Sequence, residues 1–119
     1  MAQLFELTVG NLTDIARRAI WDIGVERAET AKAGRWPLDR HILALQSSKA
    51  LARFDPDLLT LWAHKITEAF GLDCRVRRRL DHRDVVAIEV FRGEECLRLL
   101  WDNPEEVALE AFTRVMREI

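Results

Sequence analysis

The sequence predicts an α+β fold in a single domain that spans residues 1–119. The main observation is a set of three strand-like runs, joined by short turns, within residues 73–101. Such runs are typical of a three-stranded antiparallel meander. Three helical patterns precede these runs and one follows them. We therefore expect three N-terminal helices, the meander and a C-terminal helix, with the helices packed on one face of the sheet.

The N-terminal segment leaves two interpretations open. Residues 3–9 alternate weakly between apolar and polar side chains, which favours a short strand before the first helix; a helical start is the alternative. Over residues 12–31 the apolar side chains follow the spacing of a helical stripe. Asn11 or Thr13 is expected to cap this helix, and Gly24 is expected to weaken or bend it.

Two further helices are expected between a loop at 32–36 and the sheet. Pro37 suits the first position of a helix, and an apolar stripe continues from there to Phe54. Asp55 ends that helix and can cap the next one. The third stripe closes at Gly71, a residue that commonly stops helices because it tolerates the left-handed conformation.

The second hairpin of the meander can be put in register from the sequence. A two-residue loop at Gly93-Glu94 suits a type II′ turn, which needs glycine at its first central position. One face of the hairpin is then apolar and the other carries an opposite-charge pair, as expected for a sheet with one buried side. The apolar face pairs Val86 with Trp101, Ile88 with Leu99 and Val90 with Leu97. The other face pairs Ala87 with Leu100, Glu89 with Arg98 and Phe91 with Cys96.

The first hairpin is less regular. A two-residue loop at 82–83 would bury a row of guanidinium groups at a large cost in free energy, so we expect a three-residue loop at 82–84. Arg77 then lies opposite Glu89, while Arg78 points toward the core and escapes at the sheet edge. The side chains that join the apolar face in this register are Cys74, Val76 and Leu80.

The start of the C-terminal helix has a clear local signal. Asn103 can cap the helix, Pro104 suits its first position, and Glu106 can reach back to the cap amide. The apolar residues that follow at helical spacing form one stripe. We therefore expect a helix from Pro104 to the end of the chain.

Composition places the chain among ordinary globular domains. About half of the 119 residues (49%) are hydrophobic, 32% are charged, and the formal net charge is −2. This charge gives no global attraction to nucleic acid or to a membrane, and no apolar run has the length of a membrane span. The N-terminus lacks the pattern of a signal peptide, and the two cysteines are expected to be reduced thiols. We therefore expect a cytoplasmic protein.

The candidate binding residues lie mainly on the strand face opposite the apolar one. They form a charged group that is expected to face solvent or a partner, and two tryptophans outside the predicted core are added because exposed aromatic residues are enriched at interfaces. The predicted partner is another protein or a second copy of the chain, in a homodimer or an adaptor. The alternative is that the arginine-rich strand at 75–79 binds nucleic acid or an acidic ligand. The candidate residues are Arg75, Arg77, Arg79, Glu89, Arg98, Trp21 and Trp36.

No pattern in the sequence predicts catalysis, a cofactor or a metal site. The segment 81–84 holds His82 between aspartates, but hairpin tips are often rich in aspartate for reasons of turn geometry alone. Cys74 and Cys96 fall on opposite faces in the expected register and should not form a disulfide; Cys74 is expected in the core. We therefore predict a small interaction or regulatory protein that is not an enzyme.

Overall fold

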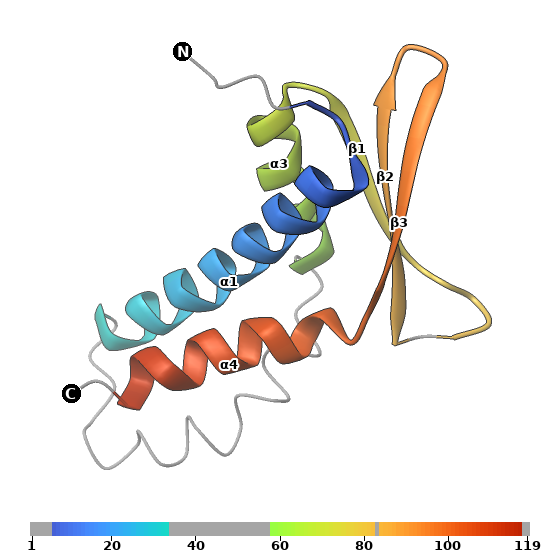
Figure 1. Cartoon of the computed structure of the whole chain (residues 1–119). Coiled ribbons are helices and arrows are strands. Elements are labelled where there is room, and N and C mark those ends of the chain that lie inside the picture. Colours follow the sequence, from blue (N-terminus) through green and yellow to red (C-terminus); the bar gives the residue numbers. More distant parts are fainter. Residues whose placement is uncertain (1–5, 34–57, 83, 118–119) are drawn as a thin grey trace.

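The computed structural model describes residues 6–33, 58–82 and 84–117. The elements in chain order are α1 (Val9–Ala33), α3 (Leu58–Phe70), β1 (Asp73–Arg78), β2 (Val85–Arg92), β3 (Glu95–Asp102) and α4 (Pro104–Arg117). The strands form one antiparallel sheet in the order β1-β2-β3. Figure 1 shows the sheet on one side of the molecule and the helices on the other.

The predicted order of three N-terminal helices before the meander is wrong. Two helices, α1 and α3, precede the sheet in the described part of the chain. The helix expected over 37–54 lies outside the described residues. The prediction of a strand at 3–9 also fails where it can be checked, since 6–8 are not in a strand and Val9 already begins α1.

Helix α1 begins earlier than expected because a different residue caps it. The hydroxyl oxygen of Thr8 accepts a hydrogen bond from the backbone N–H of Asn11 at 3.1 Å, and the Thr8 carbonyl accepts one from Leu12 at 2.9 Å. These bonds satisfy amides that have no partner inside the first turn of the helix. The cap is therefore Thr8, and α1 continues unbroken through Gly24 for 25 residues.

The register of β2 and β3 confirms the predicted one. Arg92 pairs with Glu95, and the pairing continues to Val85 opposite Asp102. Gly93 has a φ of 60°, while Glu94 does not have a positive φ, as a type II′ turn requires. Local turn chemistry and the alternation of side chains were sufficient to place this hairpin.

The register of β1 and β2 differs from the predicted one by two residues. Arg77 lies opposite Ala87 rather than Glu89, and the N–H of Arg79 donates to the carbonyl of Val85 at 2.9 Å. The loop therefore has five residues, 80–84, and Leu80 at its start is fully exposed rather than in the core. A shift by an even number of residues keeps every strand side chain on its predicted face.

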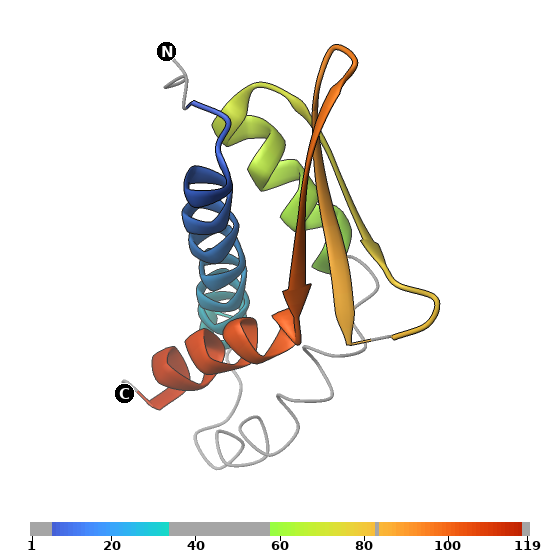
Figure 2. The same ribbon diagram turned by 45° about the vertical axis from the view of Figure 1, so that its right-hand side comes forward.

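Helices α1 and α3 cover the apolar face of the sheet, which we call the inner face (Figure 2). Trp62 is at the centre of this core: its side chain is fully buried, and its indole N–H donates to the carbonyl of Ala16 at 2.8 Å. Its ring packs against the ring of Trp101 in a T-shaped pair, with 5.6 Å between the centroids. Because the strand side chains alternate, the opposite face of the sheet remains outside this core. The buried strand residues in the core are Cys74, Val86, Ile88 and Val90.

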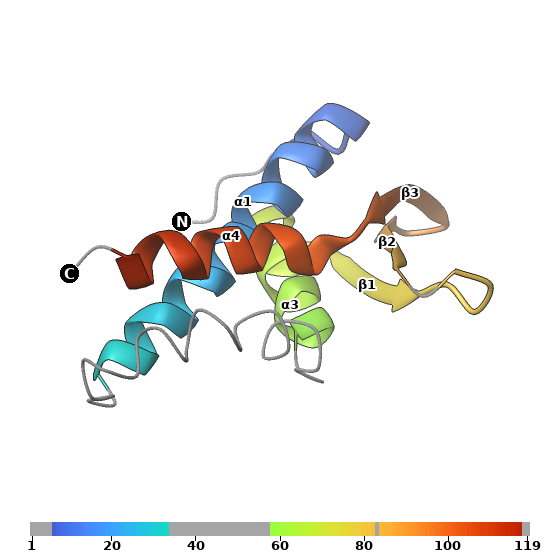
Figure 3. The same cartoon turned by 90° about the horizontal axis from the view of Figure 1, so that it is seen from below.

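Helix α4 packs on α1 rather than on the sheet, and the two helices cross in Figure 3. At the crossing, Gly24 lets the backbone of α4 approach so closely that a Cβ there would lie 2.3 Å from the carbonyl oxygen of Ala108. Further along, Ala28, Phe112 and Met116 form a second small core. Gly24 thus serves as a contact point between helices, instead of bending α1 as predicted.

The turn into α4 uses Asn103 differently from the predicted capping box. Asn103 has a φ of 50°, and its backbone carbonyl accepts a hydrogen bond from the N–H of Glu106 at 3.1 Å. Its own N–H donates to the carbonyl of Asp84 at 2.8 Å. Asparagine tolerates this left-handed conformation better than most residues do. Helix α4 therefore starts where expected, through backbone bonds.

Candidate functional site

The candidate site is the outer face of the sheet, the face opposite to α1 and α3. Odd-numbered residues of β1 and β2 and even-numbered residues of β3 point to this face, because the even-numbered residues of β2 are buried inward. No described helix covers it, and Figures 1 and 2 show helices on one side of the sheet only. The central residues of the outer face are Arg75, Arg77, Ala87, Glu89, Phe91, Arg98 and Leu100.

An ion pair holds the middle of the outer face. The guanidinium of Arg77 donates to Glu89 at 2.6 Å, and the carboxylate side chain is only 14% exposed. In the sheet Glu89 lies directly between Arg75 and Arg98. Arg77 reaches Glu89 diagonally from the next pair along, a distance that such long side chains can span. The predicted pairing of Glu89 with Arg98 is confirmed and Arg77 does lie near Glu89, but the predicted position of Arg77 directly opposite Glu89 is wrong: that position on β1 is occupied by Arg75.

The other arginines of β1 and its loop also have partners nearby. The guanidinium of Arg75 lies over the ring of Phe91 at 5.2 Å, and its Nε is 3.8 Å from Asp73. Arg79 donates two hydrogen bonds to Asp81, at 2.9 and 2.5 Å. The hydrogen bonds from Arg79 hold the pKa of Asp81 below its usual value. The positive charge that the sequence concentrates at 75–79 is therefore locally compensated.

Apolar groups lie between these charges. Ala87 is only 4% exposed because the longer side chains around it cover it, whereas Leu100, its neighbour on β3, is 51% exposed. Phe91 is half-buried under Arg75. The outer face therefore combines paired charges with accessible apolar surface, a mixture typical of surfaces that bind proteins.

The two candidate tryptophans do not join this face. Trp21 lies on α1, and the guanidinium of Arg114 on α4 covers its ring at 5.2 Å. Trp21 therefore lies at the contact between α1 and α4, where it is only partly exposed. Trp36 lies outside the described residues. Arg98 is exposed on the outer face and makes no ion pair with the part of the chain that the structure describes.

One charged contact lies on the inner side of the sheet and was missed from the sequence. Arg78 points inward, as its parity predicts, and its guanidinium forms an ion pair with Glu105 in the first turn of α4. This partner explains how an arginine can face the helices without an unpaired buried charge. Only the return of the chain from β3 into α4 brings Glu105 to this position, so no local signal could have identified it.

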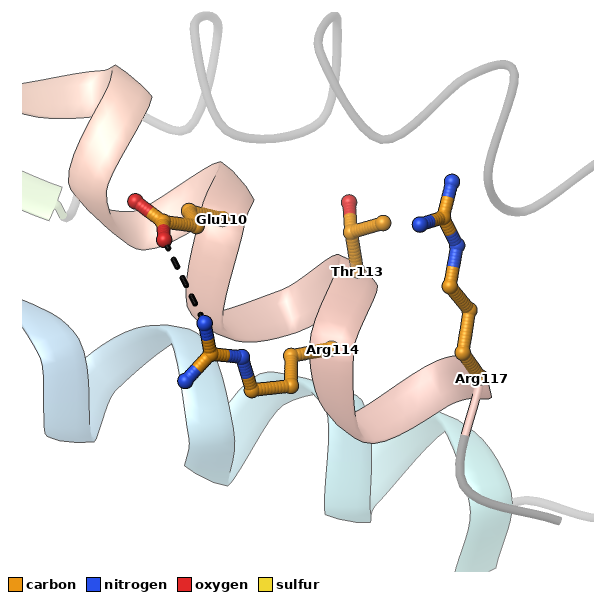
Figure 4. Close-up of a pocket in the computed structure, with 4 residues that line it drawn as sticks. All are labelled: Glu110, Thr113, Arg114 and Arg117. Atoms are coloured by element: carbon orange, nitrogen blue, oxygen red, sulfur yellow. Dashed lines mark ion pairs between the residues drawn. The ribbon is translucent and has the colours of Figure 1, made fainter.

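A depression lies along the C-terminal half of α4. Its described lining is Glu110, Thr113, Arg114 and Arg117, with Arg114 held 3.6 Å from Glu110 (Figure 4). These side chains all come from one exposed helix face. They offer no enclosed arrangement of an acid, a base and a nucleophile, which catalysis usually requires.

The thiols differ sharply in their surroundings. Both cysteines are free and Cys74 is buried, as predicted, while Cys96 is exposed. Burial, together with the nearby charge of Asp73, raises the pKa of the Cys74 thiol to about 12. A thiol with so high a pKa is a poor nucleophile at neutral pH. Within the described ranges, no group of three or more histidine, cysteine and acidic residues is placed to hold a metal ion.

None of the described helices combines the length and the apolar character that crossing a bilayer needs. No family model matches the chain, and no curated protein or solved structure is significantly similar to it.

Proposed function

We propose that this protein is a small non-catalytic interaction protein that binds another protein, as a homodimer or an adaptor, through the outer face of its sheet. The observation that supports this function is that helices cover one face of the sheet and leave the other face accessible. Helices α1 and α3 cover the inner face, while the outer face keeps accessible apolar surface at Leu100 beside ordered charged pairs. A partner that covers this face would remove that apolar surface from water.

The charge balance of the outer face favours a protein partner over nucleic acid. Glu89 forms an ion pair with Arg77 and lies between two more arginines. Asp73 and Asp81 form ion pairs with the arginines at the two ends of segment 75–79. Binding to a phosphate backbone depends on cations that are free to replace counterions. Here the guanidinium groups of Arg75, Arg77 and Arg79 would first have to give up their carboxylate partners. Titration with generic DNA and RNA at low salt should therefore show no appreciable binding.

The experiment that tests the proposal measures self-association. Sedimentation velocity over a series of protein concentrations should show a mass that rises toward that of two chains. Leu100→Asp should shift this equilibrium toward the monomer, because it places a charge in the centre of the interface. Leu61→Asp is the matched control, since Leu61 is similarly exposed (42%) but lies on α3. A mass of one chain at every concentration, or equal effects of the two substitutions, would contradict the homodimer form of the proposal.

A further inference from the structure

Strand β3 has an open hydrogen-bonding edge. It is the last strand of the sheet, and no described strand lies on its other side. Two odd-numbered positions show which residues of this strand bond to β2. Glu95 forms the hydrogen-bonded pair that closes the two-residue hairpin, and the N–H of Asn103 donates toward the β2 side. Because hydrogen-bonded pairs alternate in an antiparallel ladder, the odd-numbered residues of β3 bond to β2. The N–H and C=O groups of Cys96, Arg98 and Leu100 therefore point away from the sheet. These groups can accept a further strand.

The two edges of the sheet are protected to different degrees. In β1, four of the six residues are charged, which is a common way for proteins to prevent an edge strand from pairing with another chain. In β3, the six residues between Glu95 and Asp102 include one charged side chain, Arg98. The others are Cys96, three leucines and Trp101. An eight-residue edge of this kind is suited to pair with another strand.

We propose that β3 pairs antiparallel with β3 of a second copy of this chain, with Leu100 opposite Leu100 of that copy. This inference rests on the proposed homodimer and specifies its contact: the two chains join along the β3 edge, and of the outer face only the side chains of β3, with Leu100 at the centre, are covered. Paired residues lie on the same face of the sheet, so in two identical strands related by a two-fold axis the numbers of each pair must have an even sum. Few registers satisfy this condition. The result would be one six-stranded sheet with the two outer faces side by side.

Charge complementarity selects the register. With Leu100 at the axis, Arg98 lies opposite Asp102 of the second copy, and the two-fold symmetry repeats the pair. With Arg98 at the axis, two guanidinium groups would lie opposite each other, which is destabilising. With Leu99 at the axis, Arg98 would lie opposite Leu100 of the second copy, so no carboxylate would stand opposite its guanidinium. Both Arg98 and Asp102 are exposed and available for this pairing.

The inner side of the same edge is apolar in this register. Leu99 would lie opposite Trp101 of the second copy, twice, and both residues are only partly buried within one chain. The ring of Trp101 already packs against Trp62 and lies beneath the guanidinium of Arg17 at 5.8 Å. Pairing would thus extend the existing core along the edge of β3.

A charge-exchange experiment tests the register. Arg98→Asp and Asp102→Arg should each weaken the dimer about tenfold or more in sedimentation, because each substitution replaces two attractive contacts with repulsive ones. The double variant should recover most of the lost affinity. Both positions are exposed, and far-UV circular dichroism would verify that the variants keep the fold.

A disulfide cross-link tests the geometry independently. In a Cys96→Ser background, Leu100→Cys should give a covalent dimer under mild oxidation, since opposite residues in a hydrogen-bonded pair have Cα atoms about 5.5 Å apart. Arg75→Cys in the same background is the control, because that position lies on β1. It should give no covalent dimer.

The outcomes separate this inference from the proposed function. Recovery in the double variant together with the cross-link at position 100 would support pairing through β3. A dimer whose affinity does not change in the charge-exchange variants, and which Leu100→Cys does not cross-link, would overturn pairing through β3. Binding through the rest of the outer face would then stand. A single-chain mass at all concentrations would overturn both pairing through β3 and the homodimer form of the proposed function.

Discussion

Substitution of Gly24 tests how closely α1 and α4 approach. A Cβ at this position would lie 2.3 Å from the carbonyl oxygen of Ala108 and 2.9 Å from the Cβ of Ala111. An unstrained carbon–oxygen contact is about 3.3 Å, so Gly24→Ala should push the helices apart by about 1 Å at their crossing. The obstacle is backbone of another helix, so a side-chain rotation cannot relieve it.

Two opposing contributions set the expected change in the free energy of unfolding. Overpacking a core costs roughly 1–3 kcal/mol, and a clash with backbone belongs at the upper end, about 3 kcal/mol. Alanine is favoured over glycine in a helix interior by about 1 kcal/mol. The net destabilisation should be about 2 kcal/mol, which corresponds to a fall in Tm of roughly 6–10 °C for a domain of this size.

Urea unfolding followed by tryptophan fluorescence would measure this change. Gly10→Ala is the matched control, because it lies in the same helix and its nearest neighbour to a new Cβ is the Thr8 hydroxyl at 4.0 Å. It should leave stability unchanged or raise it by up to about 1 kcal/mol. If Gly24→Ala were as stable as the natural protein, the close crossing of α1 and α4 would be wrong.

Four further predictions concern the thiols, the outer face and the turn into α4. The pKa of Cys74 is raised to about 12, so the neutral thiol contributes fully to the free energy of unfolding below the ordinary thiol pKa of 9.0, and this contribution is lost as the pH rises toward 12. In urea titrations at alkaline pH, Cys74→Ala should not show this loss of stability. A thiol reagent should modify one cysteine in the native protein and none in Cys96→Ser. A double-mutant cycle on Arg77 and Glu89 should give a coupling of only about 0.2–1 kcal/mol, smaller at high salt, because the guanidinium is exposed; a salt-independent value would contradict this. Asn103→Val should lower stability by about 1–2 kcal/mol in thermal unfolding because of the positive φ, whereas Asn103→Gly should be nearly neutral.

The sequence alone determined the features that depend on neighbours along the chain. Alternation and the Gly93-Glu94 turn were enough to predict the pairing of β2 with β3, and Gly71, with a φ of 68°, ends α3 as expected. The inward and outward faces of all three strands were also predictable, because side chains alternate with a period of two. The outer-face candidates on the strands were found for the same reason.

Only the tertiary structure decided the features that depend on contacts between distant segments. The register of β1 is set two residues away from the predicted one, with Arg78 placed beside Glu105, which the chain brings back at the start of α4. The role of Gly24 depends on where α4 crosses α1. Likewise, Arg77 forms its ion pair with Glu89 of the neighbouring strand because of the register between β1 and β2. Local periodicity specifies which face a side chain occupies, but the partner it meets there depends on how separate elements pack.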